Sequence, residues 1–534
     1  MTQEMTLLGK LKDLAPRSLA RGALIAAGMV LSLGACLGEG PDDEGIGEES
    51  LELVEKGGIS IDPPCPPVPA CDPTIDVAQR PSLLVTLTDP GGPTILNNFF
   101  QLEDVLDQLI AEAGVTQTAT DLFQRLWDTE NTDAGGFFGE SYQPHCDDAG
   151  GTINGFPIDC PRQEGVLAGA SPADFVPVAV FNRFDLAASD GSHCGEYRII
   201  YAMVGGMPGR NFIIFEGQLP NPNPSCGVDS CRPVAEFWHG LEAMGTKARA
   251  NALHDFYFVG LPDFGPVITP ANYGFGSKGG TYGHSGGQIR TNQFGNFNRW
   301  QLREFQLDQG CSSGKELSLG GIIKAPTPTA CRLIAKPVTV KDNPFGELFN
   351  TNPLDPLTVA FQADFVDSSG GPSVVERLAA SSLMAIGLGT DDVYNAGQST
   401  SQPSGGDPDI YPNELAAGGP FAADIQTELT AISSPLTPLH ITRRAMTQSC
   451  AGCHQLNNGT HSNLGGGLTW PSSLGFVHVD EAGNVSPALS STFLPHREQV
   501  LETFLRACGP AGISKSAPSS GSKTTKTLGG SSTH

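Results

Sequence analysis

Thirteen cysteines constrain the fold of this 534-residue chain more than any other feature. Two of them belong to the pentapeptide Cys450-Ala451-Gly452-Cys453-His454, in which two thiols are separated by two residues and an imidazole follows directly. The chemistry of the other cysteines depends on the compartment, because disulfides persist outside the cytosol and are rare within it. Export would therefore place most of these cysteines in disulfides.

The N-terminus is typical of an export signal. Four basic residues precede an apolar run, 22–33, which is too short to span a bilayer. Residues 33–36, Leu-Gly-Ala-Cys, resemble the lipobox of bacterial lipoproteins. The resemblance implies a signal peptide over 1–35 and a lipid on Cys36, whereas an ordinary secretory signal is the alternative. Leu37 in place of an aspartate favours the outer membrane, with the membrane bound through the lipid alone.

Composition narrows the class of protein. The formal net charge of −26 argues against a nucleic-acid partner, because phosphate backbones would repel the chain. Abundant glycine (66) and proline (42), with only 16% charged residues, are typical of a loop-rich, largely β exported protein. We expect an acidic, proline-rich tether over 36–79, a disulfide-containing body over 80–420 and a disordered tail over 511–534.

The body is predicted to be α+β, with a mainly antiparallel sheet. Alternating apolar patterns predict strands over 175–181, 197–204, 211–218, 288–293, 301–307, 333–340 and 357–365. Helical spacing of apolar residues predicts helices over 102–109, 122–127, 233–253 and 376–386. The order of the strands in the sheet does not follow from the sequence.

The C-terminal part has a different organisation. A helix is predicted over 438–446, with Thr437 as its N-cap, and it leads directly into the Cys450–His454 motif. A glycine-rich loop follows, and then a second predicted helix over 495–508. This order resembles that of class I c-type cytochromes. The resemblance implies a small α-helical haem domain over 421–510.

The spacing of the pentapeptide suits covalent attachment of haem. Two thiols separated by two residues can add to the two vinyl groups on one edge of a haem, and the adjacent imidazole then lies beneath the iron. The resemblance thus implies haem c, with Cys450 and Cys453 as attachment points and His454 as proximal ligand. A disulfide or redox pair and a zinc site are the alternatives.

The sixth iron ligand departs from the family pattern. Class I cytochromes supply a methionine from downstream of the motif, but no methionine follows Met446. The candidates are His461, His478, His496, a histidine of the body, or an open position. We favour His478 or His496, and a second histidine would lower the reduction potential relative to methionine.

The remaining ten cysteines form an even set once Cys36, Cys450 and Cys453 are assigned. Short separations predict the disulfides 65–71, 146–160, 226–231 and 311–331, which leaves Cys194 to pair with Cys508.

Two further groups of charged residues are noted. The first comprises Arg183, Asp185, Asp190, Glu196 and Arg198. It could form a calcium or acid–base site, but turn-stabilising ion pairs are favoured. Arg443 and Arg444 could pair with haem propionates, although an exposed basic helix face is favoured.

The sequence therefore predicts an exported lipoprotein that carries one covalent haem c and transfers single electrons to a redox partner protein. One alternative is a haem peroxidase- or oxygenase-like enzyme with an open axial site. The other is a disulfide-stapled surface lipoprotein that binds a ligand and has no redox role.

Overall fold

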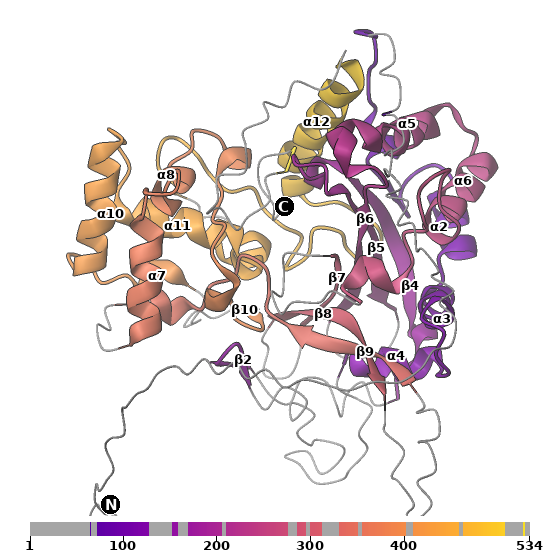
Figure 1. Ribbon diagram of the computed structural model, residues 1–534, viewed down its shortest axis with the longest axis horizontal. Coiled ribbons are helices and arrows are strands. Elements are labelled where there is room, and N and C mark those ends of the chain that lie inside the picture. Colours follow the sequence, from indigo (N-terminus) through magenta and orange to yellow (C-terminus); the bar gives the residue numbers. More distant parts are fainter. Residues whose placement is uncertain are drawn as a thin grey trace, which may run out of the picture. The chain divides into compact units, whose positions relative to one another are not determined.

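An antiparallel sheet of eight strands forms the centre of the described chain (Figure 1). The computed structural model describes residues 65, 72–127, 152–158, 169–204, 210–275, 286–294, 300–311, 331–350, 355–401, 410–458, 463–507 and 527–528. The sheet order is β1-β4-β5-β6-β7-β8-β10, and β9 pairs with β8. The strands are β1 (Leu84–Thr86), β4 (Phe175–Arg183), β5 (His193–Met203), β6 (Asn211–Pro220), β7 (Gln288–Phe294), β8 (Trp300–Cys311), β9 (Cys331–Val338) and β10 (Ser399–Ser401). The predicted β-rich, antiparallel body is thus confirmed.

One face of the sheet is covered by helices. These are α2 (Gly92–Phe99), α3 (Leu102–Glu112), α4 (Ala119–Arg125), α5 (Arg232–Gly240) and α6 (Thr246–Phe258) (Figure 1). Aromatic side chains join the two layers: the ring centre of Tyr197 on β5 lies 5.9 Å from that of Trp238 on α5 and 4.9 Å from that of Phe256 on α6. Because neighbouring residues of a strand point to opposite faces, Arg198 points away from this apolar layer.

A second group of helices packs around its own apolar cluster. It comprises α7 (Pro356–Val366), α8 (Val374–Leu378), α9 (Tyr411–Glu414), α10 (Pro420–Ala431) and α11 (Pro438–Gln448). The strand predicted over 357–365 is wrong, because Asp355 caps α7 by accepting from the backbone N–H groups of Leu357 and Thr358. Pro356 then occupies the first turn, where it favours a helix.

Two other predicted helices differ in length. The helix expected over 233–253 is divided into α5, which ends at Gly240, and α6, which has Gly245 as its N-cap. The helix expected over 376–386 ends at Leu378. By contrast, α11 begins as predicted, since the Thr437 hydroxyl accepts from the backbone N–H of His440.

The cytochrome c-like helical domain expected at the C-terminus is wrong. Helix α11 belongs to the second helical group, through Ile441, Ala445 and Met446. The chain that follows packs into the main apolar core of the sheet. Its helix α12 (Leu494–Arg506) carries Phe504, whose ring centre lies 4.7 Å from that of Phe184, at the end of β4. The apolar side chains of the two helices are thus buried in different cores rather than in one small haem domain.

The disulfides also differ from the predicted pairs. Cys194 bonds to Cys231, and Cys65 bonds to Cys226, so the expected pairs 65–71, 226–231 and 194–508 are wrong. Cys331 is disulfide-bonded and lies opposite Cys311 in the β8–β9 ladder. The expected pair 146–160 lies outside the described residues.

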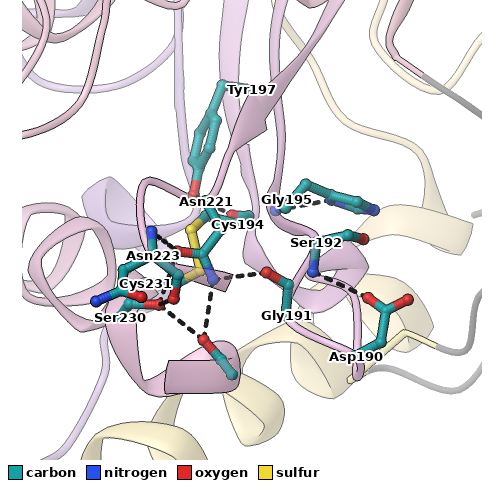
Figure 2. The surroundings of a disulfide bond; sticks show 12 residues. Asp190, Gly191, Ser192, Cys194, Gly195, Tyr197, Asn221, Asn223, Ser230 and Cys231 are labelled. Atoms are coloured by element: carbon teal, nitrogen blue, oxygen red, sulfur yellow. Dashed lines mark hydrogen bonds between the residues drawn. A yellow bond between two sulfur atoms is a disulfide. The ribbon is translucent and has the colours of Figure 1, made fainter. Parts of the chain in front are cut away.

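Topology explains the Cys194–Cys231 pair (Figure 2). The antiparallel pairing of β5 with β6 brings the start of β5 next to the segment that follows β6, although 37 residues separate the two cysteines. Asn221 fixes this corner by donating to the carbonyl group of Gly191 (2.6 Å) (Figure 2). It also donates to the carbonyl group of Gly227 (2.9 Å). Nearness along the sequence was therefore a poor guide to pairing.

The predicted signal peptide and Cys36 lie outside the described residues. Within the described residues, no helix combines the length and the apolar character needed to cross a bilayer.

The start of β5 makes stability depend on pH. Burial lowers the pKa of His193 from 6.5 to about 4, although Glu196 acts in the opposite direction. The unfolded chain therefore takes up a proton near pH 6.5, which the folded chain accepts only near pH 4. We expect the free energy of unfolding to fall by about 1–3 kcal/mol as the pH drops through this window.

Urea unfolding of His193→Gln at pH 7.5 and 4.5 tests this expectation, because the variant should lose much of the difference between the two pH values. His254→Gln, which replaces an exposed histidine of α6, is the control and should follow the unmodified chain. Equal pH dependence in both variants would contradict the assignment to His193.

Candidate functional site

The Cys450–His454 motif forms a tight turn between α11 and the loop that follows. Residues Gly452–Leu456 form a π-helical turn, and the backbone N–H of Cys453 donates to the carbonyl of Ser449 (2.9 Å). A β-carbon on Gly452 would lie 1.6 Å from the carbonyl oxygen of Met446, so only glycine fits there. The backbone N–H of Ala451 donates to the Ser399 hydroxyl of β10 (2.9 Å), which fixes the turn against the edge of the sheet.

The two thiols of the motif are buried and are not joined to each other. Cys450 is 8% exposed and Cys453 is 1% exposed, and both are free. Burial raises the pKa of Cys450 to about 12 and also raises that of Cys453. The predicted alternative of a Cys450–Cys453 disulfide is therefore not the state that the structure shows.

His454 is held in one orientation by its neighbours. Its Nδ1 lies 2.9 Å from the carbonyl oxygen of Phe476, and its ring stacks on Trp300 with ring centres 5.3 Å apart. Burial lowers the pKa of His454 to about 4, so the imidazole is neutral at ordinary pH. A carbonyl can only accept, so the proton lies on Nδ1 and Nε2 is left with a free electron pair. Metal-binding histidines in proteins use this arrangement.

His478 is also brought to the motif. Its Nε2 lies 3.1 Å from the sulfur of Cys453, its Nδ1 lies 2.9 Å from the Ser486 hydroxyl, and its ring centre lies 4.5 Å from that of His454. The other favoured candidate, His496, lies on α12 and is not among the described side chains that line the cavity beside the motif. His461 lies outside the described residues.

That cavity lies between the motif and the second face of the sheet, and the space between its lining atoms, open solvent included, is about 900 Å³. Cys450, Cys453, His454 and His478 line one side of it. Much of the remaining wall is apolar, and consists of Phe181, Ile200, Phe212, Ile214, Leu302, Val477, Val479, Leu489 and Phe493. Apolar walls with a few polar groups are typical of cofactor and ligand sites.

The sheet side of the cavity also carries charged residues in register. Arg183 lies opposite Glu196, Arg198 opposite Glu216, and Arg290 opposite Glu304 on neighbouring strands. Ion pairs link the strands further, because Glu216 contacts both Arg198 (2.9 Å) and Arg290 (3.2 Å). Opposite charges in facing positions stabilise strand pairing.

The predicted turn-stabilising ion pairs do occur, since Arg183 binds Asp185 (2.9 Å) and Arg198 binds Glu196 (2.8 Å). Arg183 and Arg198 also line the cavity, which the sequence interpretation missed together with Lys341, Arg290 and Arg497. The alternation within the strands could have identified them. Every second residue of a strand points to the same face, and there the charged residues alternate in step with buried apolar residues.

A bare metal site finds no support in the described chain. No group of three or more histidine, cysteine, aspartate or glutamate side chains in the described ranges is placed to hold a metal ion. The zinc alternative therefore lacks a ligand set there.

Scans against models of protein families and searches of curated proteins and of solved structures find no match for this chain. Its function is therefore inferred from the geometry of the site itself.

Arg444 supports the motif from behind and is not exposed, contrary to the prediction. It is 1% exposed, and its guanidinium donates to the carbonyl groups of Leu378, Ala380, Leu464 and Gly465. These bonds connect α11 to the loop that follows the motif, and they commit Arg444 to the backbone rather than to a ligand.

We expect Arg444→Lys to lower the free energy of unfolding by about 1–3 kcal/mol, because one ammonium cannot serve four buried carbonyl groups. The control is Arg443→Lys, since Arg443 makes a single bond to the carbonyl of Asn463, and its effect should stay within about 0.5 kcal/mol. Chemical unfolding at pH 7.5 measures both, and equal effects would contradict this role of Arg444.

Proposed function

We propose that this chain is an exported lipoprotein that binds one covalent haem c in the cavity and transfers single electrons through it. The observation that carries the proposal is that Cys450, Cys453 and His454 all line the same cavity. A motif that matched by chance would have no reason to face a cavity with apolar walls.

The residues around the cavity fit a haem. Its apolar walls suit the macrocycle, and the hydrogen bond from His454 to the Phe476 carbonyl leaves Nε2 available to the iron. Cys450 and Cys453 would hold the cofactor through thioether bonds. Haem, when bound, supplies one-electron exchange between ferrous and ferric iron.

The protein's own side chains contribute orientation and exclusion of water. Trp300, 1% exposed, stacks on His454 and shields it from solvent, while Phe476 fixes the tautomer. Both contacts limit the movement of the ligand when the charge at the site changes. A rigid ligand lowers the reorganisation that accompanies electron transfer.

A thiol-based redox role is less well supported. The thiolate is the reactive form of cysteine, and burial raises the pKa of both Cys450 and Cys453. Thioether attachment has no such requirement once a maturation system delivers the haem. We therefore place the redox chemistry at the haem rather than at the sulfur atoms.

One observation favours the enzyme as a second candidate. Two imidazoles that bind one metal from opposite sides, at about 2 Å each, need ring centres about 6 Å apart. The ring centres of His454 and His478 are only 4.5 Å apart, and His478 is occupied by Ser486 and Cys453. These contacts give His478 other partners, which supports the enzyme with an open axial site as the second candidate.

Covalent haem is the direct test of the proposed function. After expression in a host with c-type maturation machinery, the protein should stain for haem on a denaturing gel and give the pyridine haemochrome spectrum of haem c. The double variant Cys450→Ser/Cys453→Ser should lose the stain. The matched control Cys65→Ser/Cys226→Ser, which removes a disulfide elsewhere, should keep it. Unstained but folded protein from that host would refute haem attachment.

The ferric absorption spectrum tests the axial position. We expect His478→Ala to leave the spin state of the iron unchanged, because His478 contacts Cys453 and Ser486. We expect the same of His496→Ala, because His496 is not among the described side chains that line the cavity. A change from low-spin to high-spin iron in either variant would identify that histidine as the sixth ligand.

A further inference from the structure

The cavity contains a cationic corner formed by Arg183, Arg198 and Arg497. Arg183 binds Asp185 with two nitrogens, at 3.0 and 2.9 Å, whereas Arg497 approaches the same carboxylate only to 3.9 Å. One carboxylate is thus shared by two guanidinium groups. Arg497 is 5% exposed, so water does not compensate its charge.

Two nitrogen atoms of this corner are buried without a partner. Nε of Arg198 and Nε of Arg497 have no hydrogen-bond acceptor among the described residues. A buried donor that lacks an acceptor costs about 1–3 kcal/mol. Burial and the nearby Arg183 and Arg198 also lower the pKa of Arg497, which shows that its charge is poorly compensated.

Charge counting supports an anionic ligand. Five cationic side chains line the cavity, namely Arg183, Arg198, Arg290, Lys341 and Arg497. Glu216 is the one carboxylate among the described lining residues. Asp185, Glu196 and Glu304 also pair with these cations, so four carboxylates face five cations and one positive charge is in excess. A cationic cavity in a chain with a net charge of −26 concentrates small anions from an otherwise repulsive surface.

The position of the corner argues against haem propionates as the anion. Haem carries its vinyl groups on one edge and its propionates on the opposite edge, so the propionates point away from the thioether bonds. Arg497, the residue of the corner on α12, lines the cavity together with Cys453 and interacts electrostatically with its thiol. Arg497 therefore lies on the thioether side of the cavity.

We propose that Arg183, Arg198 and Arg497 form a binding site for a small oxyanion beside the haem. The inference rests on the proposed function. For the second candidate, the haem enzyme, it names small oxyanions as the class of substrate. Guanidinium groups bind planar oxyanions through paired N–H groups, and the buried pairs with Asp185 and Glu196 hold them in place before the ligand arrives.

Titration of the ferric holoprotein with sodium nitrite, followed by the absorption spectrum, tests the proposal. We expect saturable binding, and Arg497→Gln should raise the Kd at least about tenfold because it removes one charged donor. Arg232→Gln is the matched control, since Arg232 is also a buried arginine, stacked on Phe504 and absent from the described cavity lining. Its Kd should change less than about twofold.

Neutral imidazole is a second probe, and its binding should be equal in the unmodified protein and Arg497→Gln. An unchanged nitrite Kd in Arg497→Gln would overturn the proposal. Arg497→Gln could instead lose haem attachment while the remaining haem still binds nitrite. That result would show that the arginines bind the haem propionates, and it would also overturn the proposal.

Failure of the proposed function is measured separately. If the protein carries no haem, calorimetric titration of the cofactor-free chain with nitrite still tests the corner, with Arg497→Gln and Arg232→Gln compared in the same way. Nitrite binding that depends on Arg497 would then support an anion site in a chain without haem. If the cofactor-free chain does not bind nitrite, both the haem proposal and the anion-site proposal are overturned.

Discussion

The buried ion pairs that cross the second face of the sheet are the constraint on which the cavity depends. Glu216 joins Arg198 of β5 to Arg290 of β7, and Arg290 reaches Glu304 of β8 at 2.8 Å. A buried charge that loses its partner costs about 3–5 kcal/mol, so each of these strands is held in register by its neighbours. A fold stabilised only by packing would fill this face with apolar residues. Retaining charges there keeps a space that a polar ligand can enter.

The C-terminal segment completes that space from the opposite side. Trp470 donates from its indole nitrogen to the Cys453 carbonyl (3.3 Å), and its ring packs against Phe493 next to α12. Arg210, directly before β6, forms an ion pair with Glu481 (2.7 Å), which ties the segment to the sheet. The motif is therefore enclosed by the core of the body and is not carried on an independent module.

Local signals in the sequence were sufficient for the elements but not for their assembly. Thr437 and the proline after it predicted where α11 begins, because a cap depends only on residues within one turn. The alternation of apolar residues likewise predicted most strands. The Cys194–Cys231 bond and the pairing of Arg290 with Glu304 depend on which strands are neighbours. The apolar face of α12 indicated burial, but the sequence did not identify Phe184 as its partner.

The shared cavity gives the large β-rich body a role in the proposed site. A small cytochrome leaves a haem edge near the surface, where electron exchange needs little besides contact with a partner. Here the candidate attachment site shares its cavity with five strands of the sheet. Four of the lining cations come from the body, whereas the thiols and Arg497 come from the C-terminal segment. Neither part forms the cavity alone. If the chain holds a haem as proposed, a body of this size exceeds what attachment requires, and its charged face fits the proposed binding of an anion beside the haem. That requirement connects the unrecognised body to the motif through one chemical function.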